Sequence, residues 1–158
     1  MTGSRRRNRT FDLFAAQQRA MPILMGWAAG SLVAGWLWWQ SGVPWWRGMG
    51  SQFAGWGLID GIIAWFGLRG ARRNAARLAL GDIDQVELQG RERSFERLLW
   101  INSALDVGYI LGGGWLVQRY ADDELRRGMG WGIIIQGGFL LTFDVALAWL
   151  LRVKRRAD

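Results

Sequence analysis

Three aspartates lie singly in long apolar stretches of this 158-residue chain: Asp60, Asp106 and Asp144. Nearly all other charge is gathered in blocks between these stretches. A carboxylate at the centre of a bilayer costs at least about 2.5 kcal/mol, and such residues usually face the interior of a helix bundle. Three acids without a buried base cannot all be ionised cheaply at close range. The pattern therefore predicts that at least one acid is protonated or that a cation sits among them.

Amides and a phenol accompany the acids at helical spacings. Gln52 and Gln136 each precede an aspartate by eight residues, and Asn102, Asp106 and Tyr109 share one face at i, i+4 and i+7. Each acid lies seven or eight residues from the end of its apolar stretch that we expect to face the cytoplasm. At about 1.5 Å per residue, all three are then at a similar depth, about 10–12 Å below the inner boundary of the membrane. The predicted ligand- or ion-binding set is Asp60, Asp106, Asp144, Gln52, Gln136, Asn102 and Tyr109. The alternative is that these side chains only hydrogen-bond across helices and set their register, at about 0.6–2 kcal/mol each.

The chain contains neither Cys nor His, which excludes several kinds of chemistry. Thiol nucleophiles, disulfides and zinc–thiolate sites are impossible, and the usual ligand of haem, chlorophyll and transition metals is missing. No cofactor is therefore predicted, and the identity of any metal stays unknown. There is also no Ser/His or Cys/His arrangement of a nucleophile and a base. We expect that the protein is not an enzyme.

Four apolar runs are each close to the 20 or so residues needed to cross a bilayer about 30 Å thick. Period-2 alternation typical of barrel strands is absent from them. The predicted fold is an all-α integral membrane protein, a four-transmembrane-helix bundle. The expected spans are residues 22–39, 49–68, 98–117 and 131–151, within a membrane domain of residues 22–158.

The distribution of Lys and Arg predicts the orientation of these spans. Five lie in a basic amphipathic arm (residues 1–21), seven in the connection 69–97 and four in the C-terminal tail, against four on the other side. This bias indicates that both termini are cytoplasmic and that the chain is a multi-pass protein of the inner (cytoplasmic) membrane. The arm is expected to lie on the membrane surface. The net charge of +7 is then explained without a nucleic-acid partner.

The sequence of the first half of the chain recurs in part in the second half. Arg-Gly-Met-Gly stands at 47–50 and again at 127–130, an offset of 80, and a Gln and an Asp spaced by eight follow each copy at an offset of 84. The difference predicts an insertion of about one helical turn. We interpret the pattern as two parallel helical hairpins related by an axis along the membrane normal; coincidence in Gly- and Trp-rich sequence is the alternative. Small-xxx-small pairs that permit close helix approach occur at Gly26/Gly30, Gly57/Gly61, Gly108/Gly112 and Gly128/Gly132.

Together these patterns favour a small polytopic membrane protein whose buried polar layer binds or conducts a proton, a cation or a small polar solute. The alternative is a non-catalytic accessory or structural subunit of a larger membrane complex. The expected partners are the lipid bilayer and either further copies of the chain or other subunits.

Overall fold

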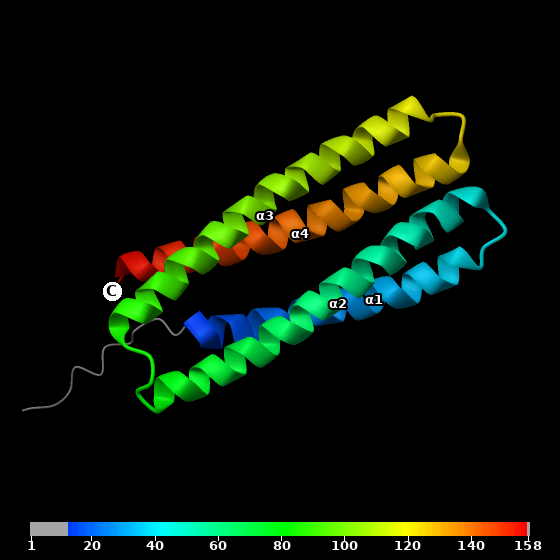
Figure 1. Ribbon diagram of the computed structural model, residues 1–158. Coiled ribbons are helices and arrows are strands. Elements are labelled where there is room, and N and C mark those ends of the chain that lie inside the picture. The colour runs from blue at the N-terminus through cyan, green and yellow to red at the C-terminus, as the bar shows by residue number, and fades with distance from the viewer. Residues whose placement is uncertain (1–12, 158) are drawn as a thin grey trace, which may run out of the picture.

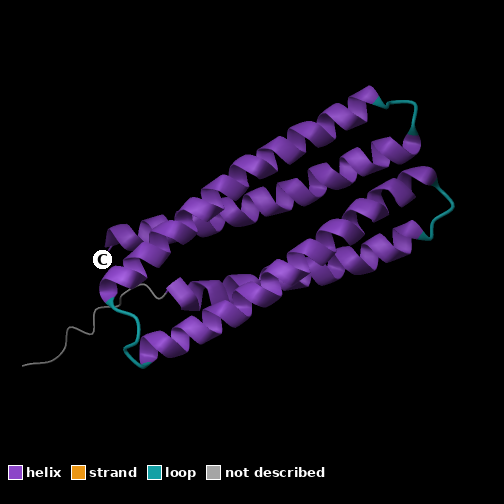
Figure 2. Cartoon of the chain, viewed as in Figure 1, coloured by secondary structure: helices purple, strands orange, loops and turns teal. Residues whose placement is uncertain are grey.

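The computed structural model describes residues 13–157, with side chains up to Val153, as four α-helices with no strand among them (Figures 1 and 2). They are α1 (Leu13–Trp39), α2 (Pro44–Ala79), α3 (Gln85–Arg119) and α4 (Glu124–Ala157). The all-helical prediction is confirmed. The first twelve residues of the expected basic arm lie outside the described residues.

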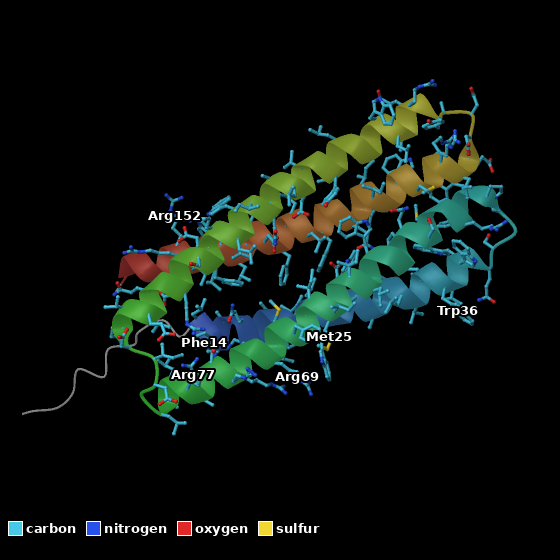
Figure 3. The ribbon with its side chains drawn as sticks, viewed as in Figure 1. Phe14, Met25, Trp36, Arg69, Arg77 and Arg152 are labelled. Atoms are coloured by element: carbon cyan, nitrogen blue, oxygen red, sulfur yellow. The ribbon has the colours of Figure 1, made fainter. Side chains whose placement is uncertain are left out.

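The four helices form two hairpins that pack against each other. α1 packs on α2, α3 packs on α4, and the hairpins meet mainly through α2 and α4. Both short loops, 40–43 and 120–123, lie at one end, whereas the 80–84 connection and the C-terminus lie at the other (Figure 1). Arg77 and Arg152 project near the end that holds the C-terminus, and Trp36 lies toward the opposite end (Figure 3).

Local sequence explains where the helices begin and end. Pro44 starts α2, where a missing N–H costs nothing. Gly81, which follows the C-cap Leu80 of α2, has a φ of 81°, a conformation that glycine adopts without strain. The Asp84 carboxylate then accepts a hydrogen bond from the Glu87 N–H at the start of α3. The expected 69–97 connection is therefore mostly helix, interrupted at the expected glycine.

The beginning of α1 differs from the expected boundary between an arm and a membrane domain. α1 starts at Leu13, and Pro22 lies inside it. Leu13 and Phe14 are 1% and 2% exposed, in a core that includes Ile83 and Leu151. Residues 13–21 are therefore helical and continuous with the rest of α1, and Leu13 and Phe14 pack against the neighbouring helices.

Two helices are long and apolar enough to span a membrane: α1 over Leu13–Trp39 and α4 over Glu124–Val153. The other two expected spans lie within α2 and α3. They fall below the same average hydropathy because polar residues, such as Gln52 and Asp60 in α2, are set among glycines and tryptophans.

Candidate functional site

The contact between α2 and α4 is reciprocal. A methyl group added at Gly48 would meet the carbonyl oxygen of Leu125, and one added at Gly128 would meet that of Trp45. Both members of one contact lie 80 residues from their counterparts in the other. Equal contacts exchanged in this way are the property of a twofold arrangement. The two hairpins are therefore packed with matching registers at the repeated Arg-Gly-Met-Gly.

The packing inside each hairpin also matches. A Cβ at Gly50 would lie 2.8 Å from the carbonyl oxygen of Gly35, and one at Gly130 would lie 2.8 Å from that of Gly113. Further along, Gly57 packs on Ala28, Ser31 and Leu32, and Gly137 packs on Asp106, Tyr109 and Ile110. These pairs give an offset of 80 between α2 and α4 and of 78 between α1 and α3.

This register corrects the predicted one-turn insertion. α4 runs without interruption from Glu124, and the offset of 80 still holds at Gly57 and Gly137. Gln52 consequently packs on Gly132 and is not the counterpart of Gln136. In the same way, Asp60 corresponds to Leu140. Asp144 lies four residues beyond Leu140 on α4, about 6 Å nearer to the end of the bundle that holds the C-terminus. The two hairpins therefore correspond in structure, but the repeated Gln-x7-Asp spacing is a coincidence because its residues do not occupy equivalent positions.

The three predicted acids are all buried. Asp60 is 2%, Asp106 4% and Asp144 8% exposed. They come from α2, α3 and α4 and lie close enough for Asp106 to interact electrostatically with Asp60, and for Asp144 to interact with both. The structure therefore brings the acids together, as a cluster and not as a single layer.

The cluster has two levels. Asp106 packs through its carbonyl oxygen on Gly137, whose counterpart on α2 is Gly57, less than one turn from Asp60. Asp60 and Asp106 therefore share a level. Asp144 lies below them, toward the C-terminal end, where the Asn102 side chain hydrogen-bonds to it.

Two carboxyl oxygens in the upper level have no partner. Oδ2 of Asp60 and Oδ2 of Asp106 are buried and accept no hydrogen bond. A buried polar atom left unpaired costs about 1–3 kcal/mol. This pair is consequently the least satisfied polar position among the described residues, and it has the capacity to hold a proton or another donor.

The structure gives the other predicted site residues contacts of different kinds. Gln136 is fully buried, but it faces α1: its Oε1 accepts from Trp27 Nε1 (2.8 Å) and its Nε2 donates to Ser31 Oγ (3.0 Å). Gln52 is half-buried, with a long 3.5 Å contact to Ser51 Oγ. Tyr109 is 41% exposed and packs edge-on against Trp56, with ring centroids 4.9 Å apart.

Two residues of α1 were not predicted to belong to this polar network. Ser31 is 2% exposed, and Trp27 stacks on Phe139 with ring centroids 4.0 Å apart. They lie four residues apart, so they share a helix face. That spacing was the available signal, but a Ser and a Trp without a charged neighbour do not stand out in an apolar helix.

The cluster offers carboxyl groups that can bind a proton or another hydrogen-bond donor. Within the described part of the chain, no three acids converge closely enough to hold a metal ion. The side chains that face the acids offer an amide, Asn102, and further carboxyls. A carboxyl pair with unpaired oxygens can take up and release a proton without large rearrangement.

Comparison with known proteins identifies a family but not a function. No curated protein matches the chain, and no solved structure matches it. Residues 23–145, a stretch that begins within α1 and ends within α4, match a family described as "Family of unknown function (DUF6992)". This stretch includes all seven predicted site residues. The chain belongs to that family.

Proposed function

We propose that this protein crosses the cytoplasmic membrane four times, as a bundle of two related hairpins with both termini in the cytoplasm. The outer surface of the helices supports this. In 48–68, 98–118 and 128–151 the only charged residues are the three buried aspartates. Large side chains such as Ile62, Leu105 and Trp115 are exposed there, and only 33% and 28% of the most apolar stretches of α1 and α4 is buried. A soluble protein would hide such helices.

The topology can be tested directly because the chain has no Cys. Single-cysteine variants can be labelled with a membrane-impermeant maleimide without background. Ser41→Cys and Asp122→Cys, in the two short loops, are expected to react on intact cells or spheroplasts. Asp82→Cys, in the 80–84 connection, is expected to react only after lysis. Labelling of all three positions without lysis would contradict the four-span arrangement.

Within this membrane protein, the aspartate cluster is proposed to bind and transfer protons, alone or coupled to the movement of a monovalent cation or small polar solute. The observation that carries the proposal is the pair of buried, unpartnered Oδ2 atoms on Asp60 and Asp106. Acids kept only for packing would be expected to have these oxygens satisfied, since partners for polar groups are what stabilise membrane helices. Asp144 and Asn102 extend the cluster toward the cytoplasmic end.

The test is proton flux in proteoliposomes that contain a pH-sensitive dye. Asp60→Asn and Asp106→Asn are expected to lower the flux at least about tenfold, a change of ~1.4 kcal/mol in the barrier. Asp122→Asn is the matched control, because Asp122 is exposed in the 120–123 loop. Unchanged flux in both cluster variants, or equal loss in the control, would remove the cluster from the mechanism.

A second candidate function is a role as an accessory subunit of a larger membrane complex. The outward apolar side chains of α1, including Ile23, Val33 and Leu37, would suit the helices of a partner as well as lipid. Native mass spectrometry of protein extracted from its own membrane distinguishes the two functions. A stoichiometric partner protein would favour the accessory role, and a single species or a homo-oligomer would favour the proton-handling role.

A further inference from the structure

A second polar feature lies on α3, away from the aspartate cluster. An open pocket of about 580 Å³ is lined by Arg93, Glu96, Arg97 and Trp100. Arg93, Arg97 and Trp100 are spaced i, i+4 and i+7, so they share one helix face, and all three are exposed. None of these residues takes part in the function proposed above.

The position of the pocket along α3 places it at the expected inner boundary of the membrane. Trp100 is 42% exposed and is near the start of the uncharged surface of residues 98–118. In the proposed orientation its indole ring lies at the inner membrane boundary, where Trp is favoured. Arg97 and Arg93 follow about 4.5 Å and 10 Å further along the helix toward the cytoplasm. That is the depth of lipid phosphates and headgroups.

The charges in the pocket suit a phosphate. The ion pairs seen among the described residues are Arg91–Glu87 and Arg126–Asp123, and neither uses Arg93 or Arg97. A guanidinium binds phosphate through two parallel hydrogen bonds. Among the described residues, Glu96 is the only acidic one that lines the pocket. It is not free of partners, because it interacts with another group of the protein. Basic pockets on the cytoplasmic side of membrane helices are suited to anionic headgroups.

We propose that this pocket binds the phosphate of an anionic phospholipid of the cytoplasmic leaflet. Arg93 and Arg97 hold the phosphate, Trp100 packs on the glycerol and upper acyl region, and Glu96 weakens binding by repulsion. The inference rests on the membrane orientation proposed above but not on the aspartate cluster, so the two can fail separately.

The experiment is native mass spectrometry of the full chain released from detergent micelles, with phosphatidylglycerol titrated against phosphatidylcholine. Phosphatidylglycerol is expected to bind preferentially. The double variant Arg93→Gln/Arg97→Gln is expected to bind it about tenfold more weakly. Glu96→Gln is expected to bind it a few-fold more tightly, a gain that misfolding could not produce. The control Arg73→Gln removes an exposed arginine of α2 outside the pocket and should change little.

Each outcome decides the proposal. Selective loss in the double variant together with a gain in Glu96→Gln supports it. Equal loss in Arg73→Gln would mean general attraction of charge and would overturn it, as would equal binding of the two lipids. Full displacement of the lipid by millimolar inorganic phosphate would assign the pocket to the free ion instead. Asp60→Asn should bind phosphatidylglycerol normally, which separates this inference from failure of the proton-handling function.

Discussion

The two hairpins pack their helices in the same way, but they carry different side chains at equivalent positions of α1 and α3. At the register set by the glycine contacts, Leu24, Ala28 and Ser31 of α1 correspond to Asn102, Asp106 and Tyr109 of α3. The backbone approaches are alike, yet one helix offers two apolar groups and a hydroxyl where the other offers an amide, an acid and a phenol. The glycines therefore determine how the hairpins pack, whereas the polar side chains differ at positions where the packing tolerates substitution.

The contacts between the hairpins show the same contrast. Gln136 of α4 bonds to Ser31 of α1, and at the equivalent positions Trp56 of α2 packs on Tyr109 of α3. A polar contact on one side is thus replaced by an aromatic contact on the other. The aspartate cluster lies on the aromatic side, between α2, α3 and α4.

The greatest loss of stability is expected from disrupting the reciprocal glycine contacts between the two hairpins. Gly128→Ala would place a methyl group against the Trp45 carbonyl, and Gly48→Ala would do the same at Leu125. Because the added group meets rigid backbone, we expect each variant to lose about 3 kcal/mol of stability. Thermal unfolding in detergent, followed by circular dichroism, measures this.

The control for that prediction is Gly108→Ala. Apart from the adjacent backbone of α3 itself, no atom lies within 4 Å of a Cβ at Gly108. The stability of this variant should therefore be unchanged or slightly raised. Similar losses at all three glycines would mean that the reciprocal contact has no special role in the fold.

A smaller effect is expected from making the hairpins more alike. Asp60→Leu copies the counterpart residue, Leu140, and removes a buried oxygen without a partner. We expect stability to rise by about 1–2 kcal/mol while proton flux is lost, since functional sites are often kept at the expense of stability. Unfolding and flux should be measured on the same preparation. A drop in stability would indicate that Asp60 is a packing residue.

A modest change in stability is expected when the Trp56–Tyr109 pair is replaced by the Gln–Ser pair found at the equivalent positions of the other side. Trp56→Gln and Tyr109→Ser each remove half of the aromatic pair, whereas the double variant recreates the Gln–Ser pair of the other side. We expect the double variant to be more stable than the sum of the single losses by about 1 kcal/mol. Strict additivity in this double-mutant cycle would argue against equivalence of the two contacts.

Much of the fold could be predicted from sequence, because its signals are local. Apolar runs between charged blocks indicated the four helices, and Gly81 marked the end of α2. The start of α1 was missed because burial of Leu13 and Phe14 depends on residues such as Ile83 and Leu151 that are distant in sequence. Membrane insertion and orientation stay predictions.

The candidate site was predicted in composition but not in arrangement. The isolated charges of Asp60, Asp106 and Asp144 marked them for burial, and all three are buried. The side that each residue faces depends on the packing register, which the Gln-x7-Asp pattern misrepresented by one turn. Gln136 therefore joins α4 to α1 through Trp27 and Ser31.

Proton binding by the aspartate cluster, as proposed above, can be tested by an infrared titration of the protein in lipid bilayers. The C=O stretch of protonated, buried carboxyl groups should weaken as the pH is raised, because the Asp60–Asp106 pair releases its proton. Asp60→Asn should remove most of that change, and Asp122→Asn should leave it intact. A band that does not respond to pH, or that responds identically in Asp60→Asn, would contradict the account and leave the acids with a packing role alone.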